Sequence, residues 1–164
     1  VASIPKREAL SPRTPISGRE TAMPYPEELV TPMRKELTDH GVTELKSATE
    51  VEDFLSTDET SLVIVNSVCG CAAGGARPGA ALAIQSETRP ARVGTVFAGQ
   101  DVEATQKARD FCAQVPPSSP SMALFKGSEL VWFLPRHMIE GRDPQSIAFD
   151  LVQAFEEHCS STAS

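Results

Sequence analysis

The hydrophobic residues of the chain form stretches of different kinds, and the clearest is an unbroken apolar run. Residues 61–66 (SLVIVN) contain four consecutive aliphatic residues, and three of them are β-branched. A strand with one face in water alternates apolar and polar positions, so an uninterrupted run predicts a central strand that is buried on both faces. Residues 94–98 (GTVFA) predict a second strand.

Two helices are predicted before these strands. Apolar residues with a spacing near 3.6 mark the first of them: Leu29, Val30, Met33 and Leu37. Gly41 should end this helix, and Pro32 should delay its start or kink it. Residues 47–50 (SATE) have the spacing of a capping box, which predicts a short second helix to about residue 55.

Three more helices are predicted downstream. Residues 72–86 are rich in alanine and should form a helix that Pro78 kinks. Asp101 is expected to cap a helix that runs to about residue 114. Asp143 precedes Pro144, which suits the first position of a terminal helix. One face of that helix is apolar and carries Ile147, Leu151 and Phe155.

The two short apolar runs at residues 121–125 and 130–134 predict an antiparallel hairpin, because Gly127 and Ser128 between them suit a tight turn. The two earlier strands are separated by a helix and should therefore pair in parallel. This order of elements predicts an α/β fold, with a mixed central sheet, helices on both faces and two extra N-terminal helices.

Residues 1–22 have a different character. They contain three prolines and no apolar periodicity, and they lack the stretch of about 7–15 apolar residues that a secretory signal needs. We expect a disordered extension here, followed by one domain over residues 23–164. The 164 residues are enough for one domain with an ordinary core.

Charge narrows the range of partners. The chain has a formal net charge of −7, and without the extension 11 cationic and 20 anionic side chains leave −9. This balance argues against binding to nucleic acid or to an anionic membrane surface. No run approaches the roughly 18 apolar residues of a transmembrane helix.

The candidate chemistry lies in a pair of cysteines, Cys69 and Cys71, at the predicted junction of the central strand with the alanine-rich helix. The free N–H groups and the dipole at a helix N-terminus stabilise a thiolate. Cys69 should face outward and Cys71 should lie in the first turn. Gly70 should leave the approach of a partner sulfur uncrowded and permit backbone angles that other residues resist. A disulfide between residues two apart closes a small, strained and oxidising ring, which suits isomerase or de-thiolation chemistry.

Other interpretations of the pair stay open. Both thiols can be passive core residues, or parts of a redox sensor without turnover. They can also begin a Zn or Cu(I) site, with further ligands from the remaining cysteines and histidines: Cys112, Cys159, His137 or His158. The glycines after the strand lack the pattern of a phosphate-binding loop.

The second candidate element is Ser119–Pro120, immediately before the hairpin. Proline is permitted where a strand begins. A cis bond there would expose the carbonyl and N–H of Ser119 as a docking edge for a substrate backbone. A trans proline in an ordinary loop is the alternative, and the cysteine pair elsewhere in the chain favours cis.

A strand followed by a cysteine pair, a proline-kinked helix, and Ser-Pro before a hairpin together resemble the thioredoxin superfamily. Four longer strings are more specific and are similar to the bacilliredoxin family: VNSVCGCAAGGARPGA, TVFAGQD, SSPSMAL and PRHMIEG, which begin at residues 65, 95, 118 and 135. The likeness covers roughly residues 25–159.

The resemblance implies a thioredoxin-like fold and a cytoplasmic thiol–disulfide oxidoreductase. Family members remove bacillithiol from protein mixed disulfides, and disulfide-isomerase activity is also associated with them. The attacking cysteine corresponds to Cys69, the second cysteine to Cys71 and the cis-proline to Pro120, with Gly70 and Ser119 at the substrate. Bacillithiol is then a co-substrate, the partners are proteins that carry it, and no bound cofactor or metal is expected.

The remaining candidates are weaker. Cys112 shares a helical face with alanines and should be a buried, inert thiol. Cys159 extends the apolar stripe of the terminal helix but lies near the chain end, where exposure would permit a regulatory disulfide. His137 and Arg136 either raise the positive potential near a thiolate or form a solvated pair at a strand end, which is the simpler interpretation.

Overall fold

The computed structural model describes residues 24–159. The extension predicted for residues 1–22 lies outside them, so the division into a tail and a domain of residues 23–164 stays a prediction. The elements, in chain order, are α1 (Glu27–Thr38), β2 (Thr43–Glu44), α2 (Ala48–Leu55), β3 (Thr60–Asn66), the π-helical segment η2 (Ala72–Ala76), α3 (Arg77–Ala83), β4 (Arg92–Phe97), α4 (Val102–Asp110), β5 (Ser121–Lys126), β6 (Glu129–Leu134), the 3-10 helix η3 (Arg136–Met138) and α5 (Pro144–His158).

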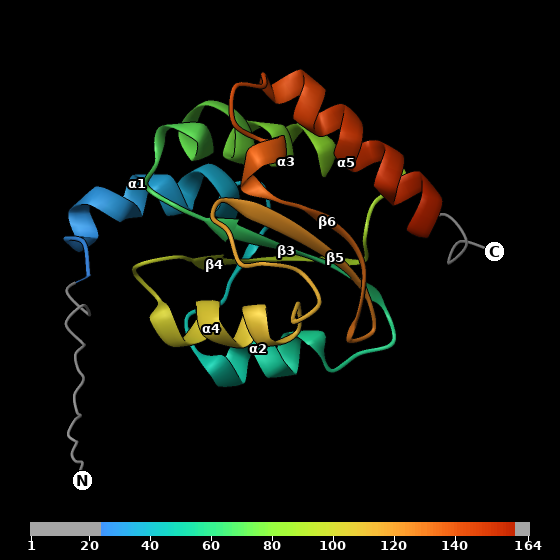
Figure 1. Ribbon diagram of the computed structural model, residues 1–164, viewed down its shortest axis with the longest axis horizontal. Coiled ribbons are helices and arrows are strands. Elements are labelled where there is room, and N and C mark those ends of the chain that lie inside the picture. Colours follow the sequence, from blue (N-terminus) through green and yellow to red (C-terminus); the bar gives the residue numbers. More distant parts are fainter. Residues whose placement is uncertain (1–23, 160–164) are drawn as a thin grey trace, which may run out of the picture.

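The strands form one mixed sheet in the order β2-β4-β3-β5-β6. β3 pairs in parallel with β4 and antiparallel with β5, and β5 and β6 form the hairpin. Helices α1, α3 and α5 lie on one face of the sheet, and α2 and α4 lie on the other (Figure 1). The predicted α/β architecture is therefore confirmed. Strand β2 was not predicted, because a two-residue strand is too short to show a pattern of alternation.

The central strand divides the core into two layers. All seven residues of β3 are buried. Leu62 and Ile64 belong to the cluster that packs beneath α3 and α5, whereas Val63 and Val65 belong to the cluster on the α2–α4 side. Successive side chains of a strand point to opposite faces, so this one apolar run supplies both layers.

Local signals at the helix ends are largely confirmed. Glu50 N–H donates to Ser47 Oγ at 3.1 Å, and the Glu50 carboxylate accepts the N–H of Lys46 at 2.6 Å. Asp143 caps α5 by accepting the N–H of Ser146 at 2.8 Å. The predicted N-termini of α2 and α5 are therefore correct.

A buried arginine corrects the expected cap of α4. Arg34 is 6% exposed and pairs with carboxylates on three elements: Glu27, Glu44 and Asp101. Because Asp101 bonds to this guanidinium, its side chain does not cap α4 as predicted.

Pro32 does not delay the start of the first helix, as the sequence suggested it could. Helix α1 begins at Glu27 and continues through Pro32. This proline is exposed, so water can solvate the carbonyl that its missing N–H leaves unpaired.

The helical segment after β3, in which Pro78 was predicted to cause a kink, begins with an irregular turn. Arg77 N–H donates to the carbonyl of Ala72, five residues earlier, so the chain makes a wide π-helical turn before α3 begins. Pro78, which has no N–H to donate, then falls in the first turn of α3. Beyond this turn α3 packs closely on α5: a Cβ added at Gly79 would lie 2.8 Å from Ile147 Cγ2.

Candidate active site

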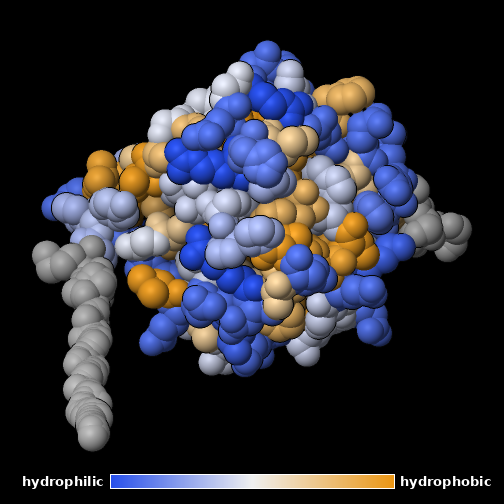
Figure 2. All heavy atoms as spheres, in the orientation of Figure 1, coloured by the Kyte–Doolittle hydropathy of each residue, from blue (hydrophilic) through white to orange (hydrophobic). Residues whose placement is uncertain are grey.

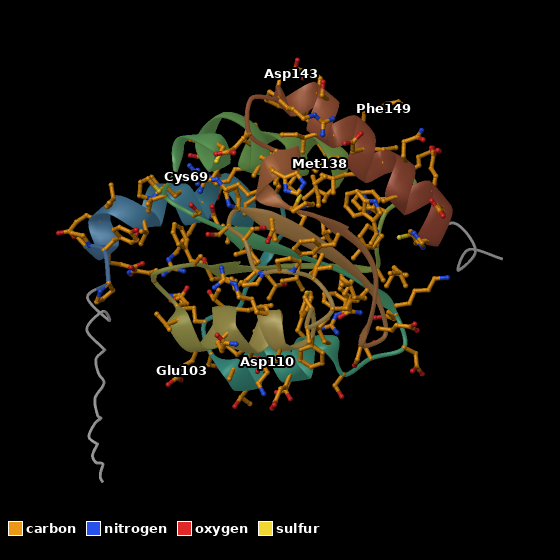
Figure 3. The ribbon with its side chains drawn as sticks, in the orientation of Figure 1. Cys69, Glu103, Asp110, Met138, Asp143 and Phe149 are labelled. Atoms are coloured by element: carbon orange, nitrogen blue, oxygen red, sulfur yellow. The ribbon has the colours of Figure 1, made fainter. Side chains whose placement is uncertain are left out.

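The cysteine pair lies where β3 leaves the sheet and the helical segment begins. The N–H of Cys69 donates to Ser67 Oγ at 3.0 Å, and its carbonyl accepts the N–H groups of Ala72 and Ala73 at 3.1 and 3.3 Å. Cys69 therefore opens the first helical turn and Cys71 lies within it, as predicted. Figure 3 shows Cys69 at this end of β3, on the side of the sheet that carries α1 and α3.

The two sulfurs are in direct contact. Cys69 Sγ lies 2.9 Å from Cys71 Sγ, and both side chains are partly exposed. Burial raises the pKa of Cys69, but hydrogen bonds with Cys71 and Ser67 and with backbone N–H groups lower it from 9.0 to about 7. Burial and the adjacent Cys69 both raise the pKa of Cys71. Cys69 is thus the thiol that ionises first, about half of it near neutral pH, while Cys71 keeps the proton that it donates.

The glycine between the cysteines is exposed, and a Cβ placed there would meet no atom of residues 24–159 within 4 Å. Gly70 does not have a positive φ. The expectation that this position needs unusual backbone angles is therefore wrong. Its effect on substrate approach stays a prediction.

The bond between Ser119 and Pro120 is cis, as predicted. The expected docking edge is altered, however. The carbonyl of Ser119 accepts a hydrogen bond from Arg136 Nη1 at 3.1 Å, and the hydroxyl of Ser118 accepts the Arg136 N–H at 3.1 Å. The Ser119 carbonyl therefore already has one hydrogen-bond partner within the protein, and the role of Ser119 and Pro120 at the substrate stays a prediction.

Arg136 is the cation that the sequence interpretation undervalued. Its positive charge opposes the upward shift in the pKa of Cys71, and its own pKa is raised by a hydrogen bond with Glu140 and then by both cysteines. It also forms an ion pair with Glu140 at 2.9 Å. Arg136 is 42% exposed at the end of β6, as the simpler interpretation expects, and its charge also acts on the thiol pair, as the other interpretation expects.

A second residue that the sequence interpretation missed is Arg77, which is 1% exposed. Its Nη1 donates to Asn66 Oδ1 at 2.9 Å and to the Ser67 carbonyl at 2.7 Å, and its Nε pairs with Glu36 at 2.8 Å. These bonds fix the loop that carries the Ser67 hydroxyl, on which the backbone of Cys69 rests. The available signal was a lone cation inside an alanine- and glycine-rich helix.

The other two cysteines lie apart from the pair. Cys112 is buried among the α4-side cluster, and burial raises its pKa to about 11. Cys159 is 3% exposed, and burial raises its pKa as well. The expectation that Cys159 is exposed near the chain end is wrong, because the last turn of α5 packs it into the core.

Within residues 24–159, no group of three or more His, Cys, Asp or Glu side chains is arranged to hold a metal ion. The additional ligands considered for the cysteine pair, from Cys112, Cys159, His137 or His158, are therefore not gathered around it in such a group. In the same residues no helix is long and apolar enough to cross a membrane.

Comparison with solved structures identifies the fold. Over 73% of its length the chain superposes on 91% of a thioredoxin from Malassezia sympodialis, with a TM-score of 0.52 and 16% identity. Over 76% it superposes on 99% of oxidised thioredoxin O2 from Arabidopsis thaliana, with a TM-score of 0.50 and 17% identity. The protein therefore has a thioredoxin fold, with a thiol pair at the start of the helix that follows its central strand.

Sequence comparison identifies the family. A family model described as disulphide isomerase matches residues 25–159. The chain is 52% identical to a bacilliredoxin of Halalkalibacterium halodurans over 82% of its own length and 94% of the relative's. It is 54% identical to one of Staphylococcus aureus, over 82% and 95%. The chain belongs to the bacilliredoxin family and is a thiol–disulfide oxidoreductase.

Proposed function

We propose that the protein removes bacillithiol, or a similar low-molecular-weight thiol, from protein mixed disulfides, and that Cys69 is the attacking group. The observation that carries the proposal is the contact of 2.9 Å between the two sulfurs, together with a pKa of Cys69 of about 7. A thiol with a pKa near the ambient pH combines a large thiolate fraction with good nucleophilicity.

In the first step the Cys69 thiolate attacks the sulfur of the small thiol. A new disulfide joins Cys69 to the small thiol, the original disulfide breaks, and the client cysteine leaves as a thiolate. Cys71 can then attack Cys69, which releases the small thiol and closes a Cys69–Cys71 disulfide. Alternatively, a second molecule of small thiol attacks the sulfur of the bound one, and a symmetric small-molecule disulfide leaves.

Two segments should lie beside a client that is bound at the attacking sulfur. Gly70 is exposed and carries no side chain to obstruct a client. Arg136 bonds to the Ser119 carbonyl and acts on both cysteines through its charge, so we propose that the Ser119–Pro120 segment supports the bound client. The proposal includes disulfide-isomerase activity, because the same thiol exchange would rearrange protein disulfides. It also includes a cytoplasmic location, because free thiols stay reduced in the cytosol.

The test uses the Cys71→Ser protein, which can accept an adduct but cannot release it by closing the ring. One client protein is supplied as its mixed disulfide with bacillithiol, with glutathione or with coenzyme A, and intact mass shows which adduct moves. Transfer from the bacillithiol form at least ten times faster than from the others supports the proposal. Equal rates would remove the bacillithiol-specific part, and no transfer from any form would overturn the whole.

A further inference from the structure

A pocket of about 370 Å³ lies on the opposite side of the sheet from α3 and α5, between the end of α4 and strands β3, β5 and β6. Small-molecule sites typically measure about 300–1,000 Å³. The cysteine pair is not among the residues that line the pocket, although Ser118 and Ser121 of its rim flank the cis-proline segment.

The pocket floor is apolar. Val63 and Val65 of β3, Phe125 of β5 and Phe133 of β6 point toward α4, because they occupy alternate positions of their strands. Cys112 forms part of the wall with its thiol protonated, since burial raises its pKa to about 11. In Figure 2, hydrophobic side chains gather over the β5–β6 hairpin on the visible face. An apolar ligand would therefore find a matching surface here.

One charged group that lines this apolar site has no anionic partner among the residues that the structure describes. Arg109, in the last turn of α4, lines the pocket, and its Nε is fully buried with no hydrogen-bond acceptor among residues 24–159. Burial alone lowers its pKa, with no carboxylate acting in the other direction. The neighbouring Asp110, also at the pocket, accepts a hydrogen bond from Gln106 at 3.0 Å instead.

The two buried arginines of residues 24–159 differ from Arg109, which is partly buried. Arg34 is neutralised by three carboxylates, and Arg77 by Glu36 and two oxygen acceptors. Arg109 is only partly buried, and its guanidinium presents several donors in a fork that matches a carboxylate. A carboxylate at the edge of this apolar pocket would therefore give Arg109 the ion pair that it lacks among residues 24–159.

We propose that this pocket binds a small amphipathic carboxylic acid, with its carboxylate on Arg109 and its hydrocarbon body on the sheet. The site goes beyond the proposed thiol exchange and does not depend on it, because no redox step occurs in the pocket. The positive charge of Arg109 favours a carboxylic acid over a neutral apolar molecule as the ligand.

The probe is decanoate, compared with decanol, in calorimetric titrations of the reduced full-length protein. The protein should bind decanoate about tenfold more tightly than decanol, which is the usual size of one charge-assisted hydrogen bond in place of a neutral one. Shortening the acid to octanoate should weaken binding about tenfold or more, because each buried CH₂ is worth about fourfold.

Variants locate the site. Arg109→Gln should abolish the preference for acid over alcohol and leave decanol binding unchanged. Lys107→Gln is the matched control: it removes a positive charge from the same helix, but this lysine pairs with Glu52 and does not line the pocket. Val115→Trp should fill the rim and weaken both probes. Decanoate binding that is unaffected by Arg109→Gln, or equal affinity for decanoate and decanol, would overturn the proposal.

Discussion

The charge state of the attacking sulfur depends on its neighbour, and this dependence gives a quantitative prediction. Cys71 is the largest of the influences that lower the pKa of Cys69 to about 7. Replacing Cys71 by alanine removes the donor and should move the pKa of Cys69 up toward 9.0. Serine at the same position keeps a hydroxyl donor, so Cys71→Ser is the matched control and should retain most of the shift.

The magnitude follows from the two pKa values. At pH 7 about half of Cys69 is thiolate when the pKa is about 7, and about 1% when it is 9.0, which is about a fiftyfold loss. A more basic thiolate is intrinsically more nucleophilic, by about six- to tenfold over two pKa units. The rate of Cys69 alkylation at pH 7 should therefore fall about five- to eightfold at most in Cys71→Ala.

The assay is the rate of alkylation by iodoacetamide from pH 5 to 10, followed by mass spectrometry of the Cys69 peptide, with Cys69→Ser as the blank. The apparent pKa should be near 7 in the native protein and distinctly higher in Cys71→Ala. An apparent pKa that stays near 7 in Cys71→Ala would show that the contact between the sulfurs does not lower it. A native value near 9 would refute the reasoning altogether.

The same shift has a consequence for stability. The pKa of Cys69 is lower in the folded protein than in the unfolded chain, so its contribution to stability is present above the unfolded value near 9. This contribution is lost as the pH falls through about 7. The free energy of unfolding in urea should therefore fall more between pH 9 and pH 6 for the reduced native protein than for Cys69→Ser.

Three further predictions concern residues around the site. Arg77→Met leaves buried acceptors without a donor and should lower the free energy of unfolding, measured in urea, by about 3 kcal/mol. Lys35→Met is the control: it removes an exposed ion pair with Asp39 and should lower the free energy of unfolding by less than about 0.5 kcal/mol. Gly79→Ala forces a Cβ against α5 and should lower the free energy of unfolding by about 1–3 kcal/mol. Gly74→Ala is its control, because a Cβ there meets no neighbour among residues 24–159 and should leave the stability unchanged; thermal melts of the two variants make the comparison. Arg136→Gln removes a cation that faces the thiols, so the second cysteine should titrate at a still higher pH in a thiol absorbance titration, and an unchanged titration would contradict the assigned role.

The sequence was sufficient wherever a signal is local. The unbroken run of β3, the capping residues Ser47 and Asp143, and the turn at Gly127 each depend on neighbours within a few positions, and each was predicted correctly. The cysteine pair was found for the same reason, since its spacing and the preceding strand are visible in the chain.

The remaining features depend on contacts between distant segments. Arg136 acts through its charge on cysteines that lie at least 65 positions earlier in the chain. Arg77 bonds to Glu36, which lies 41 positions earlier, so no local pattern reveals either role. Asp101 has the sequence of a cap, but Arg34 competes for its carboxylate. Cys159 is buried because α5 packs along its whole length on the sheet, and that contact outweighs its position near the end of the chain.

The central claim is that Cys69 takes the small thiol directly from the client. The measurement that tests it most directly is peptide mass mapping after a single turnover, in which a bacillithiolated client is mixed with Cys71→Ser or with Cys69→Ser. The adduct should be found on Cys69 in the first protein, with one equivalent of free client thiol released, and nowhere in the second. An adduct on Cys71 in the Cys69→Ser protein at the rate of the first reaction would contradict the account.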